Sequence, residues 1–272
     1  MPLISISNLG SDLADMYVLS TLRDIWRDMG LQVEVGKEYA KDADLCILHH
    51  DLTRLDPSAL PEAPKGVPVL NARVLDISKR SYSSLRVLPG DAWDGPVIVK
   101  TDLNAFGRPE QNRTGRLPLL QRGRRRLAKT DWRLARMLPK QTYPVLNSVK
   151  QVPGWVWERD DLLVERFMPE REGEYYCQRG CLFFGEASYG YRIYSTHPTV
   201  KTGTMEKYDY LDKIPPEIEA QRREMGFDFG KFDYVEHDGR AILLDANKTP
   251  TFRGDRKSER ITRLAKAVEG YL

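Results

Sequence analysis

Residues 226–251, GFDFGKFDYVEHDGRAILLDANKTPT, restrict the fold more than any other stretch of the chain, because they are typical of two strands joined by a turn. The first strand is expected to lead in through Lys231–Glu236 and the second to lead out through Ala241–Leu244. Between them, His237-Asp238-Gly239 has the composition of a turn. We therefore expect a β-hairpin near the C-terminal end of the chain.

Three oxygen-bearing side chains lie on this hairpin, namely Asp233 on the first strand and Asp245 and Asn247 on the second. Asp245 and Asn247 are two residues apart and so share one face of their strand. A two-residue turn at Asp238-Gly239 would pair Asp233 with Leu244 and turn Asp245 to the other face. The turn therefore decides whether the three side chains meet.

A three-residue turn, with Gly239 in the left-handed conformation, would pair Asp233 with Leu243 and bring the three side chains together. The apolar pattern favours this second register, because one face then carries Phe232, Tyr234, Ile242, Leu244 and Ala246. Two carboxylates and an amide oxygen at one point suit a hard cation such as Mg²⁺. The alternative is that Asp233 and Asp245 are separate, solvated acids at strand ends.

Composition narrows the class of protein. The chain has 272 residues, of which 41% are hydrophobic and 30% charged, and a net charge of only +3, so it is a globular chain that as a whole is not built to bind polyanions. No apolar run reaches the roughly 20 residues of a membrane helix, and we expect no signal peptide. The three cysteines, Cys46, Cys177 and Cys181, form no CxxC pair, which indicates a reducing, cytoplasmic location.

The N-terminal part has the pattern of a small βαβ unit. We expect a strand over Leu3–Ser7, an amphipathic helix over Asp12–Met29 capped by Ser11, and strands over Leu31–Val35 and Leu45–His49. This order predicts a small parallel sheet, and the absence of GxGxxG argues against a dinucleotide fingerprint. Further strands are expected over Val67–Leu70, Pro96–Lys100, Leu162–Phe167 and about 175–194. Further helices are expected over Val74–Leu88, Pro216–Met225 and about Ser258–Leu272.

Residues 113–136 carry most of the concentrated positive charge. This segment holds Lys129 and eight arginines against one acid, Asp131; the arginines are at positions 113, 116, 122, 124, 125, 126, 133 and 136. Leucines and a tryptophan alternate with the charges, which predicts a basic amphipathic helix from about Leu127 to Leu138.

Two further stretches are compatible with nucleotide binding. Lys100 ends the strand VIVK, and backbone amides near Asn104–Gly107 in the loop that follows would cradle phosphate oxygens. In LLVERFMPEREGEYY, a strand that ends at 165–169 and then bends would offer free backbone groups to a purine edge, with a carboxylate nearby for ribose hydroxyls. The alternatives are an exposed lysine and an edge strand with an acidic loop.

In the order of lysine, hinge, paired acids and Asn-x-x-Pro, the chain resembles the ATP-grasp superfamily, most strongly in FDYVEHDGRAILLDANKTP. The resemblance implies an α/β and α+β architecture with a small N-terminal Rossmann-like domain. It divides the chain into an N-terminal domain over residues 1–78, a small subdomain over 79–165 with an Arg-rich insertion at 113–140, and a large subdomain over 166–272.

The resemblance also implies roles for residues. Asp233, Asp245 and Asn247 would hold one or two Mg²⁺ ions that bridge the phosphates of ATP. The nucleotide would be bound by Lys79, Lys100, Asn104, Gly107, Glu165, Arg166, Phe167, Met168 and Glu174, with Glu172 as the substitute for Glu174. The cations near the γ-phosphate or the substrate carboxylate would be Arg253, Arg192 and Lys201. Departures from the family pattern are Asp245 in place of the commoner glutamate, Thr251 in place of glycine after Pro250, and a loop after Lys100 that is poor in glycine.

The activity that the resemblance implies is a ligase that uses ATP and Mg²⁺ to activate a substrate carboxylate as an acyl phosphate, which an amine or another nucleophile then attacks. One alternative is an ATP-grasp kinase acting on a small molecule. Another is a non-catalytic protein that binds an anionic partner or nucleic acid through the basic segment. We expect a small-molecule or peptide carboxylate as substrate, an acidic one being compatible with the basic segment. We expect no membrane and no nucleic acid as partner, and the sequence is compatible with a homodimer.

Overall fold

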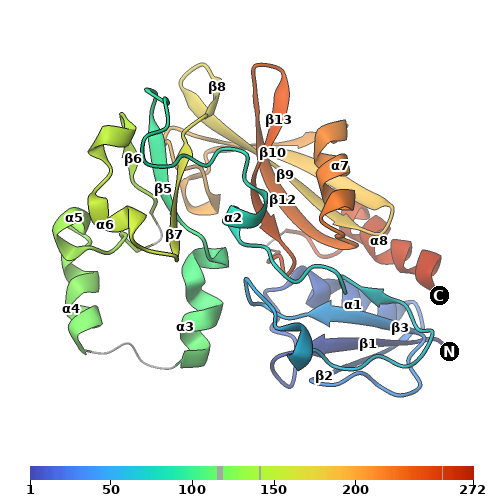
Figure 1. Ribbon diagram of the computed structural model, residues 1–272. Coiled ribbons are helices and arrows are strands. Elements are labelled where there is room, and N and C mark those ends of the chain that lie inside the picture. Colours follow the sequence, from blue (N-terminus) through green and yellow to red (C-terminus); the bar gives the residue numbers. More distant parts are fainter. Residues whose placement is uncertain (115–118, 141, 253) are drawn as a thin grey trace.

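The computed structural model describes residues 1–114, 119–140, 142–252 and 254–272, and these ranges build three β-sheets with helices against them (Figure 1). The first sheet is parallel and has the order β2-β1-β3-β4. Its strands are β1 (Leu3–Asn8), β2 (Gln32–Gly36), β3 (Leu45–His49) and β4 (Val69–Leu70). The small parallel sheet predicted from the sequence is confirmed.

Helix α1 (Val18–Asp28) is shorter than predicted, because the residues before it pair with another segment of the chain. The helix does not begin after Ser11. Instead, Tyr17 forms a β-bridge with Thr251, and the Val18 N–H donates to the carbonyl of Pro250 at 2.9 Å. The segment ahead of α1 is therefore paired with the chain that follows the C-terminal hairpin.

The C-terminal helix α8 (Glu259–Lys266) packs against α1, in a hydrophobic core that also includes residues of the first sheet (Figure 1). Trp26 of α1 is fully buried, and its indole N–H donates to the carbonyl of Ala265 at 2.8 Å. Ile261, Leu264 and Val268 are buried, as the spacing of the C-terminal helix predicted. The two ends of the chain thus share one hydrophobic core.

The second sheet is antiparallel, with the order β6-β5-β7, and carries several short helices. Its strands are β5 (Val97–Thr101), β6 (Val145–Leu146) and β7 (Leu162–Arg166). The helices are α2 (Lys79–Tyr82), α3 (Arg108–Thr114), α4 (Leu119–Leu127), α5 (Trp132–Ala135) and α6 (Gly154–Trp157). Only Lys79–Tyr82 of the predicted helix over Val74–Leu88 is α-helical.

The single basic helix predicted from Leu127 to Leu138 is wrong. Helix α4 ends at Leu127, and α5 begins anew after Asp131, whose carboxylate accepts a hydrogen bond from the Leu134 N–H at 2.9 Å. Arg136 is left-handed (φ 48°) and ends α5. An N-terminal cap inside the predicted helix therefore divides the segment into two short helices.

The third sheet is antiparallel and has the order β11-β10-β9-β12-β13, with β8 also pairing with β9. Its strands are β8 (Glu170–Glu172), β9 (Tyr175–Phe184), β10 (Ala187–Ser195), β11 (Lys207–Leu211), β12 (Phe229–His237) and β13 (Arg240–Asn247). Helix α7 (Pro216–Glu224) packs on one face through Ile218. Short 3₁₀ turns are η1 (Pro57–Ala59), η2 (Asn104–Gly107), η3 (Val149–Gln151), η4 (Thr202–Thr204) and η5 (Ala267–Tyr271).

The mixed α and β architecture predicted from the sequence is confirmed. Strand β7 ends at Arg166 and so crosses the predicted boundary at 165/166 by one residue, and the domain boundaries stay predictions. In the described part of the chain, every helix falls short of the length and apolar character needed to cross a bilayer.

Candidate active site

A cavity of about 660 Å³ lies between the small β5–β7 sheet and the uncovered face of the large sheet. Among the residues predicted to be functional, those lining it are Lys79, Lys100, Asn104, Arg166, Phe167, Met168, Lys201, Asp233, Asp245 and Asn247. These residues come from α2, β5, η2, the end of β7, the loop before β11, and the hairpin. The structure therefore brings together most of a set that is scattered along the sequence.

The hairpin brings its acids together by a route that the sequence did not show. The turn contains two residues, Asp238 and Gly239, and His237 pairs with Arg240. This register alone would have put Asp245 on the wrong face. However, the register shifts between Asp233 and Tyr234, where β13 has one extra residue, Leu244, in a β-bulge, and Asp233 pairs directly with Asp245.

The predicted three-residue turn is therefore wrong, and so is part of the predicted apolar face. Leu243, opposite Tyr234, is buried in the core with it, whereas Leu244 lines the cavity. The predicted meeting of the two carboxylates is nevertheless observed, because the bulge turns Asp245 back to the side of Asp233.

The strand pairing extends this arrangement across the large sheet. Asp233 of β12 also pairs with Gly180 of β9, which pairs with Tyr191 of β10, which pairs with Tyr210 of β11. Directly paired residues point to the same face of a sheet. One row across five strands therefore carries Tyr210, Tyr191, Gly180, Asp233 and Asp245 along the floor of the cavity.

Gly180 leaves room for the Tyr191 ring. A Cβ atom on Gly180 would lie 2.2 Å from Cζ and 2.4 Å from the hydroxyl oxygen of Tyr191. The ring must therefore lie across β9, in the direction of Asp233. Burial raises the pKa of Tyr191 to about 12, although the charge of Lys231 opposes this, so the phenol is neutral near pH 7.

Each of the two paired acids forms an ion pair with a lysine. The ammonium of Lys79 lies 2.8 Å from Oδ1 of Asp245, and that of Lys231 lies 2.8 Å from Oδ2 of Asp233. Burial lowers the pKa of Lys79, but the carboxylate of Asp245 outweighs this and keeps the pKa well above its ordinary value. Both lysines are thus positively charged near pH 7. Sequence reasoning missed Lys231, although its position two residues before Asp233 places both side chains on one strand face.

Lys100 forms a third pair at the opposite wall, with its ammonium 2.6 Å from Oε2 of Glu165. Glu165 is only 1% exposed and does not line the cavity. Its position fits a partner of Lys100 rather than a contact of the nucleotide, because the carboxylate is covered by the lysine.

The acids fit a magnesium ion. Oδ1 of Asp233 is buried and accepts no hydrogen bond from the described residues. Burial and the charge of Asp245 raise the pKa of Asp233, while Lys231 opposes the shift. In the described ranges, no three His, Cys, Asp or Glu side chains gather as a metal-binding group. A metal here would rely on two carboxylates, the Asn247 oxygen and oxygens of water or phosphate, which is the kind of site that Mg²⁺ uses in nucleotide-binding enzymes.

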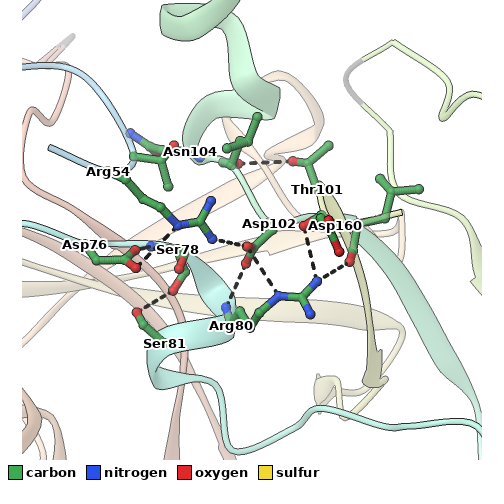
Figure 2. A network of polar contacts seen from close by, with 12 residues as sticks. Arg54, Asp76, Ser78, Arg80, Ser81, Thr101, Asp102, Asn104 and Asp160 are labelled. Atoms are coloured by element: carbon green, nitrogen blue, oxygen red, sulfur yellow. Dashed lines mark hydrogen bonds and ion pairs between the residues drawn. The ribbon is translucent and has the colours of Figure 1, made fainter. Parts of the chain in front are cut away.

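A buried carboxylate, Asp102, connects the elements that carry the lysines (Figure 2). It is fully buried, and its Oδ1 accepts a hydrogen bond from the backbone N–H of Arg80 at 2.8 Å. The guanidinium of Arg54 also binds this carboxylate, and Arg80 extends to the carbonyl of Leu162 at 2.9 Å. Asp102 therefore holds α2, the end of β5, the start of β7 and the chain at Arg54 in fixed relation.

The wall opposite the large sheet is mainly apolar. Phe167 and Met168 follow β7 and line the cavity. The Arg166 N–H donates to the carbonyl of Leu85 at 2.8 Å, and the Phe167 N–H to that of Pro96 at 2.9 Å. The resemblance implied that the backbones of Arg166 and Met168 meet the adenine. Among the described residues, the Met168 N–H has no hydrogen-bonding partner, so it is the one of the two amides that is available to an adenine edge.

The loop after β5 continues the same wall of the cavity. Asn104, Ala105 and Phe106 line the cavity, and the last two are left-handed (φ 46° and 61°) although neither is glycine. Phe106 stacks on Tyr143, with 4.4 Å between the ring centroids. Gly107, predicted to contact phosphate, is buried behind this loop and does not line the cavity.

Three further predicted residues lie elsewhere. Glu174 is exposed in the turn before β9 and does not line the cavity, and neither does its substitute Glu172. Arg192 is bound to Glu170 at 2.7 Å and also to Glu172, so its charge is used within the sheet. The position of these residues does not support the predicted roles. Arg253 lies outside the described residues.

The N-terminal sheet contacts the hairpin at the end of β13. The Tyr17 hydroxyl and the Thr249 hydroxyl each donate to the carboxylate of Asp51 at 2.7 Å. His49, the last residue of β3, is fully buried beside the Tyr17 ring, and neither of its ring nitrogens has a partner among the described residues. Burial lowers the pKa of His49 to about 3.

Comparisons with solved structures show which known fold the chain is similar to. The ATP-grasp ligase PsnB, complexed with minimal precursor, matches with a TM-score of 0.51 and 11% identity, over 99% of this chain and 98% of that chain. D-alanine–D-alanine ligase from Bacillus anthracis matches with a TM-score of 0.49 and 12% identity, over 100% of this chain and 97% of that chain. The macrocyclase MdnC from Microcystis aeruginosa, bound with precursor peptide MdnA, matches with a TM-score of 0.49 and 10% identity, over 99% and 100%. No protein-family model and no curated protein sequence matches the chain.

Proposed function

Since this chain has the ATP-grasp fold, we propose that it is a ligase that uses ATP and Mg²⁺ to join a substrate carboxylate to an amine or another nucleophile. The reaction transfers the γ-phosphoryl group of ATP to the carboxylate, giving ADP and an acyl phosphate. The nucleophile then attacks the acyl carbon, and the phosphate leaves.

The residues of the cavity suit this chemistry, which asks mainly for positioning and charge neutralisation. Asp233, Asp245 and Asn247 would hold the metal, which supplies positive charge to the phosphate oxygens when bound. Lys79 and Lys100 reach the cavity from opposite walls and would bind phosphate oxygens. Phe167 and Met168 offer an apolar surface and one open N–H to the adenine.

The observation that carries the proposal is the direct pairing of Asp233 with Asp245 in a cavity that Lys79, Lys100 and Lys231 also line. Two carboxylates side by side repel each other, and a structure retains them when cations neutralise them. Lys79 and Lys231 do so here, each at 2.8 Å. The same carboxylates can turn to a metal while the freed lysines turn to phosphate.

The test measures binding of a non-hydrolysable ATP analogue with Mg²⁺, by thermal shift and calorimetry, in Asp245→Ala and Asn247→Ala. We expect both variants to fold and to lose at least about 100-fold in affinity or turnover, because each removes an oxygen ligand of the metal that would neutralise the phosphates. Asp238→Asn is the matched control, because this acid lies in the turn of the same hairpin and its side chain is 92% exposed. Native binding and turnover in both cavity variants would contradict the site.

The products separate the ligase from a kinase. A ligase releases free phosphate and needs both an acyl substrate and a nucleophile. A kinase leaves the phosphoryl group on a stable ester and releases ADP alone. A screen of carboxylates with amines, followed by phosphate detection and mass spectrometry of the products, therefore decides between the two.

A further inference from the structure

The cavity extends past the paired acids along the large sheet, where tyrosine side chains line it. Tyr189 and Tyr191 of β10 and Tyr208 and Tyr210 of β11 line this end, and we refer to these four as the tyrosine wall. Tyr191 and Tyr208 are stacked with 5.5 Å between ring centroids, and Tyr208 meets Tyr210 edge to face at 5.0 Å. The rings therefore support one another, and Tyr208 and Tyr210 stay 39% and 49% exposed.

The distance from this wall to the acids follows from the strand order. Neighbouring strands lie about 4.8 Å apart, so β11 lies roughly 14 Å from β12, across β9 and β10. The Tyr191 ring, lying over Gly180, bridges part of that distance. A ligand that touches both the wall and the Asp233 end of the cavity must therefore be elongated.

Arg260 of α8 supplies a positive charge at the wall. Its guanidinium carbon lies 3.4 Å from the ring centroid of Tyr210, and the side chain lines the cavity. Among the described residues, Arg260 has neither an ion-pair partner nor a hydrogen-bonding partner. A guanidinium stacked on an aromatic ring keeps its N–H groups in the plane, where they can bind a carboxylate with two parallel hydrogen bonds.

The other charges at this end leave room for an anion. Asp255 lines the cavity but is exposed, and it accepts a hydrogen bond from the Lys257 N–H at 2.9 Å. Lys207 and Asp209 form their own pair at 3.0 Å.

We propose that the tyrosine wall and Arg260 form the binding subsite for the acyl substrate. The substrate then carries a ring or another planar group that stacks on the tyrosines, and a second anionic group, apart from the reacting carboxylate, that Arg260 binds. The assignment to the acyl substrate rests on the proposed function, because it takes the Asp233 end as the place of phosphoryl transfer. The preference of the subsite for a planar anion does not depend on it.

The experiment measures the affinity of benzoate and benzamide, as a planar anion and its neutral counterpart, by titrated saturation-transfer NMR. A non-hydrolysable ATP analogue and Mg²⁺ are present to fill the lysine end of the cavity. The native protein is expected to bind benzoate at least about tenfold more tightly than benzamide, the size of a charge-assisted hydrogen bond. Arg260→Gln should reduce benzoate affinity to the level of benzamide, and Tyr210→Leu should weaken both probes.

Lys266→Gln is the matched control, since it removes one exposed positive charge from the same helix outside the cavity. Arg260→Lys keeps the charge but loses the planar guanidinium that can donate two parallel hydrogen bonds. Its benzoate affinity should lie between those of the native protein and Arg260→Gln. Equal affinities of benzoate and benzamide in the native protein, or native benzoate affinity in Arg260→Gln, would overturn the subsite.

The nucleotide is measured separately in the same samples. If the ATP analogue fails to bind while Arg260→Gln still loses benzoate, the proposed function fails and the planar-anion subsite remains. If the analogue binds and Arg260→Gln keeps benzoate, the subsite fails and the proposed function remains.

Discussion

The floor of the cavity and the basic segment at 113–136 both concentrate charge, but in opposite ways. On the floor, Lys79 and Lys231 each lie 2.8 Å from a carboxylate, in positions set by strand pairing. On the basic segment, Arg122, Arg126 and Lys129 are exposed and have no ion-pair partner among the described residues. The basic segment carries more charged residues, whereas the charged side chains on the floor are held in place by ion pairs.

The difference shows which charges can act in a reaction. Charges that are buried and already oriented act on a substrate without further rearrangement, which is the basis of electrostatic catalysis. Exposed charges are hydrated and screened by salt, and contribute little unless a partner covers them. The basic segment therefore suits recruitment of an acidic partner better than chemistry. Four changes test this contrast, the largest expected effect first.

The largest effect is expected from Lys100→Met, because it leaves Glu165 buried without its cation. The free energy of unfolding should fall by about 3 kcal/mol, as when one partner of a buried ion pair is removed. Affinity for the ATP analogue should fall with it. Urea denaturation and calorimetry measure the two effects.

The double variant Lys100→Met/Glu165→Leu separates the causes. It should recover most of the stability and none of the nucleotide affinity, because the unpaired charge is gone but the phosphate contact is still missing. A Lys100→Met protein as stable as the native one would show that the pair is not organised as described.

The next effect is expected from Gly180→Ala, which places a methyl group 2.2 Å from Cζ of Tyr191. The ring must move, at a cost of about 1–3 kcal/mol for overpacking. Tyr191→Ala should remove the clash, so that the double variant is more stable than the sum of the two single changes predicts. Additive effects in a double-mutant cycle by urea denaturation would mean that the ring does not lie over Gly180.

A smaller effect, dependent on pH, is expected from His49. Its pKa is lowered from 6.5 to about 3 by burial, so between these values the unfolded chain binds the proton and the folded chain does not. The stabilising contribution is complete above pH 6.5 and is lost as pH falls towards 3. His49→Phe should therefore flatten the decline in unfolding free energy between pH 6.5 and 4 by at least about 1 kcal/mol.

His50 titrates nearby, with a pKa lowered to about 4 by burial, and it stays in place in this variant as an internal reference. Unfolding by urea at several pH values gives the profile. If native and variant curves are parallel over this range, His49 is not buried in its neutral form.

The smallest effect is expected from Arg122→Gln/Arg126→Gln on the basic segment. Stability should change by less than about 0.5 kcal/mol and affinity for the ATP analogue should not change, because these side chains are exposed and unpaired. If the segment recruits an acidic substrate, the KM for that substrate rises and its salt dependence weakens. A large loss of stability would show that these arginines form stabilising contacts like those on the cavity floor.

Local patterns allowed much of the fold to be predicted. The parallel N-terminal sheet and the C-terminal hairpin followed from short alternating runs, turn residues and helix spacing. The pair of acids and Lys79 and Lys100 followed from the family resemblance, and all four line the cavity. These features depend on neighbours in sequence or on a motif, which is why the sequence showed them.

What could not be predicted depends on contacts between distant segments. The bulge that brings Asp245 opposite Asp233 lies in the strands and not in the turn, so the turn alone misled the prediction. Tyr191 becomes part of the floor only because Gly180 lies opposite it, and Arg260 only because α8 packs beside β10. Arg192 was predicted as a cation near the γ-phosphate or the substrate carboxylate, whereas in the fold Glu170 and Glu172 bind it.

The β-bridge between Tyr17 and Thr251 has a mechanical consequence. The peptide just after Asn247 is fastened to the entrance of α1, and Asp51 fastens the same place a second time through Tyr17 and Thr249. These contacts couple the N-terminal sheet to the end of β13 that carries Asn247, so a displacement of that sheet would also displace this end of the hairpin.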